Sequence, residues 1–415
     1  MPDVPNAAPA RYLTQVQLND IRAFRAVVLP IETEEGAPRK RTLLIGKNGT
    51  CKSTLLRAIA IGLADPGDAQ AMIASPIGRL VSRTETHGQI KLTLRGYELD
   101  SAPSDVVRII ASQDEKEYLD SRLLPEPNPP FVVAYGAGRF SSGADPHSLR
   151  NYRALDAVAG LFNHPRPLAD PELTLRRLGD FFETALYERT LEGVKRVLGL
   201  EPEDTIAFRR GGGVEISGPS VGPTVSLDAW ADGYRVTFTW LLDFFGWALR
   251  AGAIDEDGTI RGILLIDEVD QHLHPSMQAQ VLPRLSELLP EVQIIATTHS
   301  PLVALGAAPA ELVALHRLPS GEVVTAPAPD FRLYSAEDML TDDRLFATAP
   351  YSEEVNQKTE RYRELVDIPA PSRRVREQRE LHALARELSR PADPAEPEVA
   401  AFEEVKSILA KHGIR

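Results

Sequence analysis

A short glycine-containing loop between an apolar run and a helical pattern constrains the fold of this chain more than any other feature. Residues 42–45 form the apolar run, and residues 53–63 place apolar side chains at helical spacing. The sequence therefore predicts a strand, a loop and a helix in that order. Backbone N–H groups that converge at a helix N-terminus bind phosphate, because the helix dipole favours negative charge there. The predicted phosphate-binding loop consists of Gly46, Lys47, Asn48, Gly49, Thr50, Cys51, Lys52, Ser53 and Thr54.

Two side chains at the start of this helix suit a nucleoside triphosphate with a magnesium ion. Lys52 can place its ammonium group on the β- and γ-phosphates, and the Ser53 hydroxyl can ligate Mg²⁺. The loop departs from the usual pattern at Cys51, which stands where a second glycine is expected. If the backbone has a positive φ there, a cysteine costs roughly 1–2 kcal/mol. We expect this departure to weaken nucleotide binding without abolishing it.

Two further apolar runs end in polar side chains that are typical of a phosphoryl-transfer site. Residues 263–266 are followed by Asp267 and Glu268, and residues 294–297 lead to His299. Ligands of open α/β sheets bind at the carboxyl ends of the strands, so we expect these side chains to lie at that edge. Asp267 suits Mg²⁺, Glu268 can deprotonate an attacking water, and a neutral His299 can hydrogen-bond the γ-phosphate or that water.

The order of strands and helices predicts the domain organisation. Apolar strands that alternate with helical patterns favour an α/β fold with a parallel or mixed sheet. We expect one large domain over residues 1–330, with a helical insertion at about 150–205, and a helical tail over 331–415. The tail is charged and ends in an amphipathic helix predicted at 400–411. Either a partner-binding region or a cap on the parent domain fits this tail.

Composition and charge argue against several classes of protein. Hydrophobic residues at 43% and charged residues at 25% are ordinary for a globular protein. A single cysteine rules out a disulfide within the chain and suits a reducing compartment, so we expect the cytoplasm. The most apolar long stretch, residues 238–249, is too short for a bilayer, which needs about 20 apolar residues. A net charge of −13 disfavours tight, sequence-independent binding to DNA by the whole surface.

Together, these motifs resemble those of ABC-type ATPases in the RecF, SMC and OLD-like group. The resemblance spans roughly residues 16–315 and includes a segment similar to the signature motif, with Asp232 and Gly233 in place and Ala231 where a serine is usual. It implies an ABC-type P-loop ATPase head that binds ATP with Mg²⁺ and hydrolyses it, slowly if the two substitutions matter. In such ATPases the signature of one subunit closes the ATP site of its partner, which implies a head-to-tail homodimer or a higher homo-oligomer.

Weaker similarities indicate a group within these ATPases. Residues 136–139, 161–163 and 168–172 are similar to segments of the Septu and retron-associated ATPases of bacterial anti-phage systems. That resemblance implies a regulatory ATPase that controls a separate effector, often an HNH nuclease. We expect no nuclease in this chain, because Asp342 and Asp343 lack the flanking strands of a metal site.

The sequence leaves two other functions and two residue assignments open. A RecF-like DNA-repair ATPase would bind DNA directly and in a salt-dependent way. The ATP-binding subunit of a transporter would co-purify with a membrane protein. Gln89 and Gln113 are candidates for the Q-loop glutamine of such ATPases. Phe24 fits a core position better than one that stacks on adenine.

Overall fold

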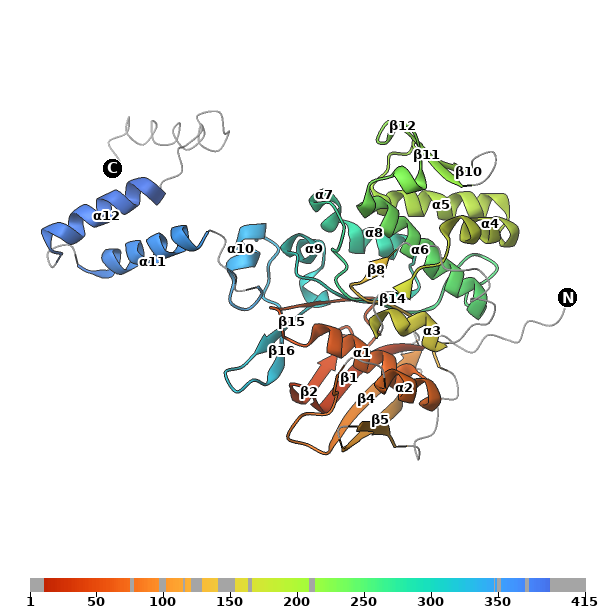
Figure 1. Ribbon diagram of the computed structural model, residues 1–415, viewed down its shortest axis with the longest axis horizontal. Helices are drawn as coiled ribbons and strands as arrows, with labels where there is room; N and C mark the ends of the chain where they lie inside the picture. The colour runs from red at the N-terminus through yellow and green to blue at the C-terminus, as the bar shows by residue number, and fades with distance from the viewer. Residues whose placement is uncertain are drawn as a thin grey trace. The chain divides into compact units, whose positions relative to one another are not determined.

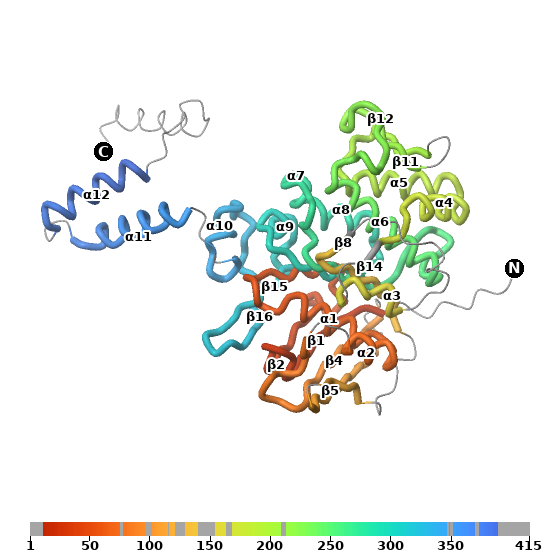
Figure 2. Tube along the Cα trace, in the orientation of Figure 1, coloured from red at the N-terminus to blue at the C-terminus, as the bar shows by residue number. Residues whose placement is uncertain are grey.

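The computed structural model describes residues 11–74, 78–96, 102–114, 116–120, 129–140, 154–162, 166–208, 213–346, 348, 352–369 and 373–388. The predicted helix at 400–411, and residue 163 in one of the weaker similarities, lie outside these ranges. The chain divides into two compact units, Met1–Ala347 and Thr348–Arg415. Figure 1 labels the helices and strands, and Figure 2 follows the same chain as a tube.

A six-stranded sheet forms the centre of the first unit. In spatial order its strands are β16 (Val323–Pro327), β15 (Leu312–Arg317), β3 (Arg41–Ile45), β14 (Val292–Thr297), β13 (Gly262–Ile266) and β7 (Val132–Tyr135). The five strands from β15 to β7 are parallel, and β16 pairs antiparallel with β15. The predicted α/β fold with a mixed sheet is thereby confirmed.

Alternate side chains of the central strands enter two different cores. Along β3, Leu43 and Ile45 belong to one core and Leu44 belongs to the other. Since successive side chains of a strand point to opposite faces, this alternation places one hydrophobic layer on each face of the sheet. Parallel strands covered on both faces read as continuous apolar runs, which is why the sequence pattern identified them.

A five-stranded antiparallel sheet and two helices build the first of these layers. The elements are β2 (Phe24–Pro30), β1 (Arg11–Ile21), β4 (His87–Gly96), β5 (Ser104–Gln113), β6 (Lys116–Leu119), α1 (Lys52–Leu63) and α2 (Pro66–Ile73). Helix α1 contacts β4 and β5 as well as β7 and β14, so it lies between the two sheets. A Cβ at Gly62 would come within 2.4 Å of Leu92 Cδ1 in β4, so the helix approaches this sheet very closely.

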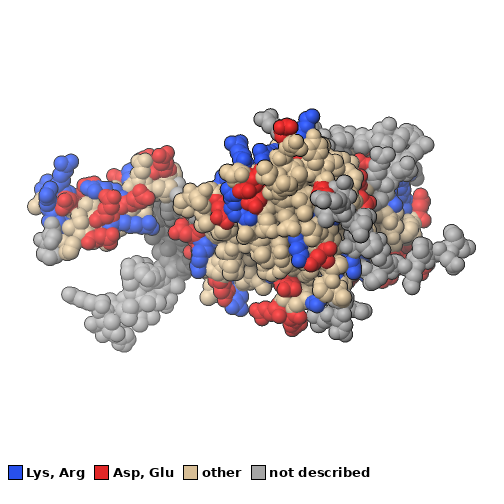
Figure 3. All heavy atoms as spheres, turned by 90° about the horizontal axis from the view of Figure 1, so that it is seen from below, with Lys and Arg blue, Asp and Glu red and all other residues tan. Residues whose placement is uncertain are grey.

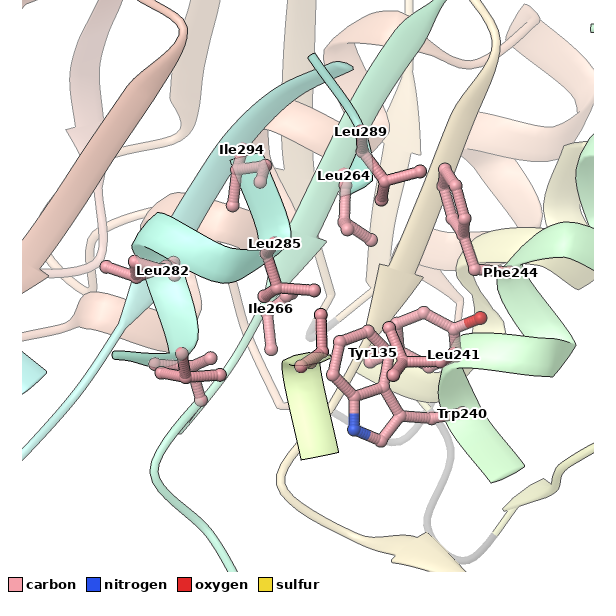
Figure 4. Packing of buried hydrophobic residues seen from close by; sticks show 14 of the residues in the cluster. Tyr135, Trp240, Leu241, Phe244, Leu264, Ile266, Leu282, Leu285, Leu289 and Ile294 are labelled. Carbon is pink, nitrogen blue, oxygen red and sulfur yellow. The ribbon is translucent and has the colours of Figure 1, made fainter. Parts of the chain in front are cut away.

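Helices cover the other face of the central sheet. They are α4 (Pro171–Phe181), α5 (Thr184–Leu198), α6 (Asp232–Ala251), α7 (Pro275–Gln278), α8 (Val281–Leu288), α9 (Pro301–Leu305) and α10 (Ala336–Thr341). Helix α3 (Ala154–Val158) lies at the edge of the sheet, where it contacts β7 and α2. Figure 4 shows Trp240, Leu241 and Phe244 of α6 packed towards β13, the strand that carries Leu264 and Ile266. None of the described helices is long and apolar enough to span a membrane.

The insertion predicted at about 150–205 contains the helices α3, α4 and α5, and a small sheet follows it. After α3 to α5, the chain forms a small antiparallel sheet of β10 (Thr205–Phe208), β11 (Val214–Gly218) and β12 (Gly222–Ser226) before α6 begins. Two very short strands, β8 (Arg139–Phe140) and β9 (Arg166–Pro167), pair in parallel ahead of α4. Among the described residues of this unit, 3₁₀ turns lie at Ala159–Leu161, Leu227–Ala229 and Pro309–Glu311.

The first unit extends past the predicted domain boundary at residue 330. Phe331, Met339, Leu345 and Phe346 are buried in its core and follow that boundary in the chain. The second unit is a helical hairpin of α11 (Glu353–Asp367) and α12 (Val375–Leu388). Its two helices are joined by the ion pairs Arg361–Glu380 and Lys358–Glu387 and bury only Leu365 and Leu381.

Candidate functional site

The loop between β3 and α1 adopts a backbone that requires glycine at two positions. Gly46 has φ +149° and Gly49 has φ +83°. A Cβ at Gly46 would come within 2.5 Å of the Leu315 carbonyl oxygen, so any other residue there would collide with β15. Cys51 also has a left-handed backbone, with φ 63° and ψ 26°. The condition under which the cysteine costs roughly 1–2 kcal/mol is therefore met.

Lys52 begins α1 and bends back over the loop. Its Nζ donates hydrogen bonds to the carbonyl oxygens of Gly46 at 2.7 Å and Lys47 at 3.3 Å. Burial lowers the pKa of Lys52 to about 8, although the nearby Asp267 and Glu268 carboxylates act in the opposite direction. The ammonium group is thus poorly solvated and is close to the carboxylates that follow β13.

Ser53 and Thr54 occupy the next positions of the first helical turn. Ser53 is half-buried, and Thr54 is buried with its Oγ1 accepting a hydrogen bond from Arg22 Nη1 at 3.2 Å. The Ser53 hydroxyl and the Asp267 carboxylate are oxygen ligands, which Mg²⁺ prefers. The described residues hold no ready-made group of three or more His, Cys, Asp or Glu side chains for a metal.

The two carboxylates after β13 have different environments. Asp267 is buried, and its Oδ1 accepts a hydrogen bond from Thr297 Oγ1 at 2.6 Å. The Glu268 N–H donates to the same Thr297 oxygen at 2.8 Å. Burial, and then the Asp267 and Asp270 carboxylates, raise the pKa of Glu268 above its usual range. A half-buried carboxylate with a raised pKa is suited to accept a proton.

His299 lies at the carboxyl end of β14, which is the strand between β3 and β13. Burial, and then the positive charge of Lys52, lower the pKa of His299. Its imidazole is therefore neutral at pH 7, so one ring nitrogen can donate and the other can accept a hydrogen bond. Because β3, β14 and β13 are adjacent and parallel, their ends bring Lys52, His299 and Glu268 to one edge of the sheet.

The predicted signature residues lie on a separate element, at the N-terminus of α6. Asp232 is exposed and forms an ion pair with Arg235 at 2.6 Å. Gly233 packs so closely on the turn after β13 that a Cβ would come within 2.1 Å of the His272 carbonyl oxygen. Ala231 is the N-cap of the helix and provides no side-chain hydrogen bond. Tight packing within the same chain therefore explains why position 233 is a glycine.

One residue at the site, Arg139, was included in the segment 136–139 by the sequence analysis but was given no role there. Arg139 lies in the strand β8 just after β7, with 4% of its surface exposed. Its guanidinium donates to the carbonyl oxygens of Asp267 at 3.0 Å and Glu268 at 2.6 Å. Burial lowers its pKa to about 10, so it is still charged at pH 7. The glycine-containing turn at 136–138, directly after an apolar strand, was the sequence signal that could have indicated a role for Arg139.

The structure resolves two of the open assignments. Phe24 is fully buried in the core beside α1, so the core assignment is confirmed and the adenine-stacking alternative is wrong. Gln89 lies within β4 and accepts a hydrogen bond from Asn19 Nδ2 at 3.0 Å, while Gln113 ends β5. Both glutamines belong to the antiparallel sheet, and neither extends from the strands whose ends carry Lys52, His299 and Glu268.

Comparison with known proteins finds relatives in the group that the motifs predicted. The family model described as "AAA domain, putative AbiEii toxin, Type IV TA system" matches residues 231–305, which include the signature segment, Glu268 and His299. The Septu protein PtuA of Bacillus mycoides (strain KBAB4) is 24% identical over 372 residues, 89% of this chain and 49% of that protein. This chain thus spans about half the length of that relative.

Two further similarities are shorter. The Retron Ec83 probable ATPase of Escherichia coli is 57% identical over 47 residues, 11% of this chain and 8% of that protein. Among solved structures, the SMC head domain from Thermotoga maritima matches with a TM-score of 0.43 and 13% identity, over 77% of this chain and 99% of that one. The resemblance predicted from the motifs is thus confirmed, because this chain is similar in sequence to the Septu protein PtuA and to the retron ATPase.

Proposed function

We propose that this protein binds ATP with Mg²⁺, hydrolyses it, and acts as the regulatory ATPase of an anti-phage defence system. The observation that carries this proposal is the convergence of Lys52, Glu268 and His299 at the ends of three adjacent parallel strands. A phosphate-binding loop, a carboxylate with a raised pKa and a neutral histidine at one edge are the parts that phosphoryl transfer to water needs. The names of the relatives support the same activity.

Each side chain has a distinct role in this proposal. The loop N–H groups and Lys52 bind the β- and γ-phosphates, and Ser53 and Asp267 hold Mg²⁺, which neutralises charge on those phosphates. Glu268 takes the proton of the attacking water. His299 donates a hydrogen bond to the γ-phosphate and stabilises the charge that develops there. In these roles Asp267 and Glu268 stay distinct, since only Asp267 is tied to Thr297 through its side chain.

A large cavity beside the loop is the proposed position of the nucleoside. Its volume is about 860 Å³, within the range of small-molecule sites, and Cys51 forms part of its wall. Arg22, which also contacts Thr54, connects this cavity to the first turn of α1. The arginines that line it are Arg22, Arg25, Arg79, Arg83 and Arg317. Their positive charge suits the α-phosphate of a nucleotide.

The assembly we propose is a head-to-tail homodimer, or a higher homo-oligomer, in which the signature of one subunit covers the ATP of its partner. The exposure of Asp232 at the start of α6 supports this, because the position is open to a second subunit. Ala231 lacks the hydroxyl that would reach the γ-phosphate, which is the reason to expect slow turnover.

The effector is proposed to be a separate protein, of the HNH nuclease type, contacted by the second unit. That unit exposes Val375 at 72% and Val366 at 44% on an otherwise charged hairpin, which is typical of a contact surface. Direct action on DNA, the alternative left open above, is less well supported. In the face drawn in Figure 3, acidic and basic side chains are interspersed among the described residues, so a broad basic surface is not apparent there.

ATP turnover by the purified chain, beside Glu268→Gln, tests the proposal. Glu256→Gln, an exposed glutamate in the turn after α6, is the matched control. We expect Glu268→Gln to lose turnover by a hundredfold or more, to keep nucleotide binding, and to form a larger assembly by size-exclusion mass analysis in ATP and Mg²⁺. Equal turnover in Glu268→Gln and wild type would refute the role of Glu268. ATP binding without turnover in any variant would make the protein an ATP-gated scaffold.

A further inference from the structure

Arg139 is a buried charge whose side chain donates two hydrogen bonds to the turn that carries the proposed general base. It lies outside the loop, the strand ends and the signature segment. Nη1 and Nη2 donate to the carbonyl oxygens of two consecutive residues, Asp267 and Glu268. Its Nε is buried without a hydrogen-bond partner among the described residues. Burial of a charged and partly unsatisfied group is costly, so packing alone would favour an apolar side chain here.

The turn at Glu268 needs an external support. Glu268 has φ 50°, a left-handed backbone that residues other than glycine rarely adopt. Strained positions of this kind persist only where the surroundings fix them. A guanidinium is a rigid fork that donates two bonds with defined directions, so it can fix two successive peptide planes at once. The direction of those planes sets where the Glu268 side chain points.

A polar cluster between β7 and α6 lines the same cavity as Arg139 and also holds the start of the turn. Tyr135, at the end of β7, accepts a hydrogen bond from the Asp267 N–H at 2.8 Å through its carbonyl oxygen. Its hydroxyl donates to Asp243 Oδ2 of α6 at 2.8 Å, and Trp247 Nε1 donates to the same oxygen at 3.0 Å. Tyr135, Arg139 and Asp243 all line one small cavity of about 30 Å³. Figure 4 shows the Tyr135 ring beside Trp240 of α6.

We propose that Arg139 is a positioning residue for Glu268, whose guanidinium fork holds the Asp267 and Glu268 carbonyls so that the Glu268 carboxylate faces the attacking water. This inference rests on the proposed ATPase function. It assigns Arg139 a role through Glu268 and not through contact with the nucleotide. Removing the fork therefore lowers the rate of hydrolysis while the affinity for ATP is kept.

The test compares Arg139→Lys and Arg139→Met with matched variants of Arg108. Arg108 is also buried, with 1% of its surface exposed, and donates to the Ala64 carbonyl oxygen at 2.9 Å, at the opposite end of α1 from the loop. For each variant, kcat and KM for ATP, the Kd of a fluorescent ATP analogue and the midpoint of urea unfolding are measured. The Arg108 variants report what loss of a buried arginine does to stability alone.

We expect Arg139→Met to lower kcat by a hundredfold or more and Arg139→Lys by about tenfold, with KM and Kd within threefold of wild type. Lysine keeps the charge but has a single donor nitrogen instead of the planar fork, so we expect an intermediate loss. In the Glu268→Gln background, Arg139→Met should lower the residual single-turnover rate by less than twofold. Two changes that act through one group are not additive.

Three results would overturn the inference. One is an unchanged kcat in Arg139→Met. Another is a loss of kcat in Arg108→Met as large as that in Arg139→Met at equal urea midpoints. The third is a full additional loss of rate in the double variant. If turnover in Glu268→Gln equals that of the wild type, the proposed function is refuted together with the inference. If Glu268→Gln abolishes turnover but Arg139→Met turns over ATP as fast as the wild type, only the inference about Arg139 is refuted.

Discussion

Replacement of Gly233 by alanine tests the packing of the signature helix on the turn after β13. The added Cβ would lie 2.1 Å from the His272 carbonyl oxygen. Carbon and carbonyl oxygen atoms normally approach to about 3.3 Å, so α6 or the turn has to move by more than an ångström. The turn cannot give way easily, because Glu268 and His272 already have left-handed backbones with φ 50° and 66°.

The expected cost follows from that overlap. Overpacking of a dense interior costs about 1–3 kcal/mol, and the better helix propensity of alanine returns up to about 1 kcal/mol. Gly67 is a matched control, since it is the second residue of α2 as Gly233 is of α6, and a Cβ there would meet nothing within 4 Å. Because the propensity gain is common to both variants and cancels, we expect Gly233→Ala to be about 1–3 kcal/mol less stable than Gly67→Ala.

Urea unfolding followed by tryptophan fluorescence measures this difference. The three tryptophans of the chain, Trp230, Trp240 and Trp247, lie in α6 or directly before it, so the signal reports on the perturbed region. The difference in the free energy of unfolding follows from the two urea midpoints, with one common slope for the decrease of that free energy with urea concentration. Equal midpoints for Gly233→Ala and Gly67→Ala would refute the close contact between α6 and His272.

Three further predictions concern the loop and the domain boundary. Cys51→Gly should stabilise the folded protein by about 0.5–1 kcal/mol in urea unfolding, because relief of left-handed strain exceeds the entropy cost of glycine; a destabilised variant would contradict this. The affinity for ATP should fall by up to tenfold per pH unit above pH 8 in binding titrations. The reason is that Lys52 has a pKa of about 8 before ATP binds and must take up a proton to hold phosphate. The Lys52→Arg variant should show no such fall in affinity. A wild-type affinity that is constant from pH 8 to 9.5 would refute this prediction. In thermal unfolding, a fragment of residues 1–347 should have the same melting temperature as the first unit of the full chain. A fragment of residues 1–330 should have a lower melting temperature, because it lacks the core residues Phe331 and Met339.

The sequence predicted those parts of the site that depend on local pattern. An apolar run, a glycine-containing loop and a helical repeat are sufficient to predict a strand, a loop and a helix, and Gly46 and Gly49 have the positive φ that such a loop needs. Asp267, Glu268 and His299 could be assigned to one edge because parallel strands end on the same side of a sheet. The same periodicity gave the central strands, whose side chains are buried on both faces.

The relation between distant segments was beyond the reach of the sequence. The position of Arg139 depends on a contact with residues 128 and 129 places further along the chain, and the close packing at Gly233 depends on His272. The first unit was predicted to end at residue 330, where a proline-rich stretch suggested a boundary. Phe331 and Met339 follow that stretch but pack into a core built from earlier segments. The sequence by itself determined which residues follow each strand; the tertiary structure alone decided which of them meet, because those contacts join elements whose order in the sheet differs from their order in the chain.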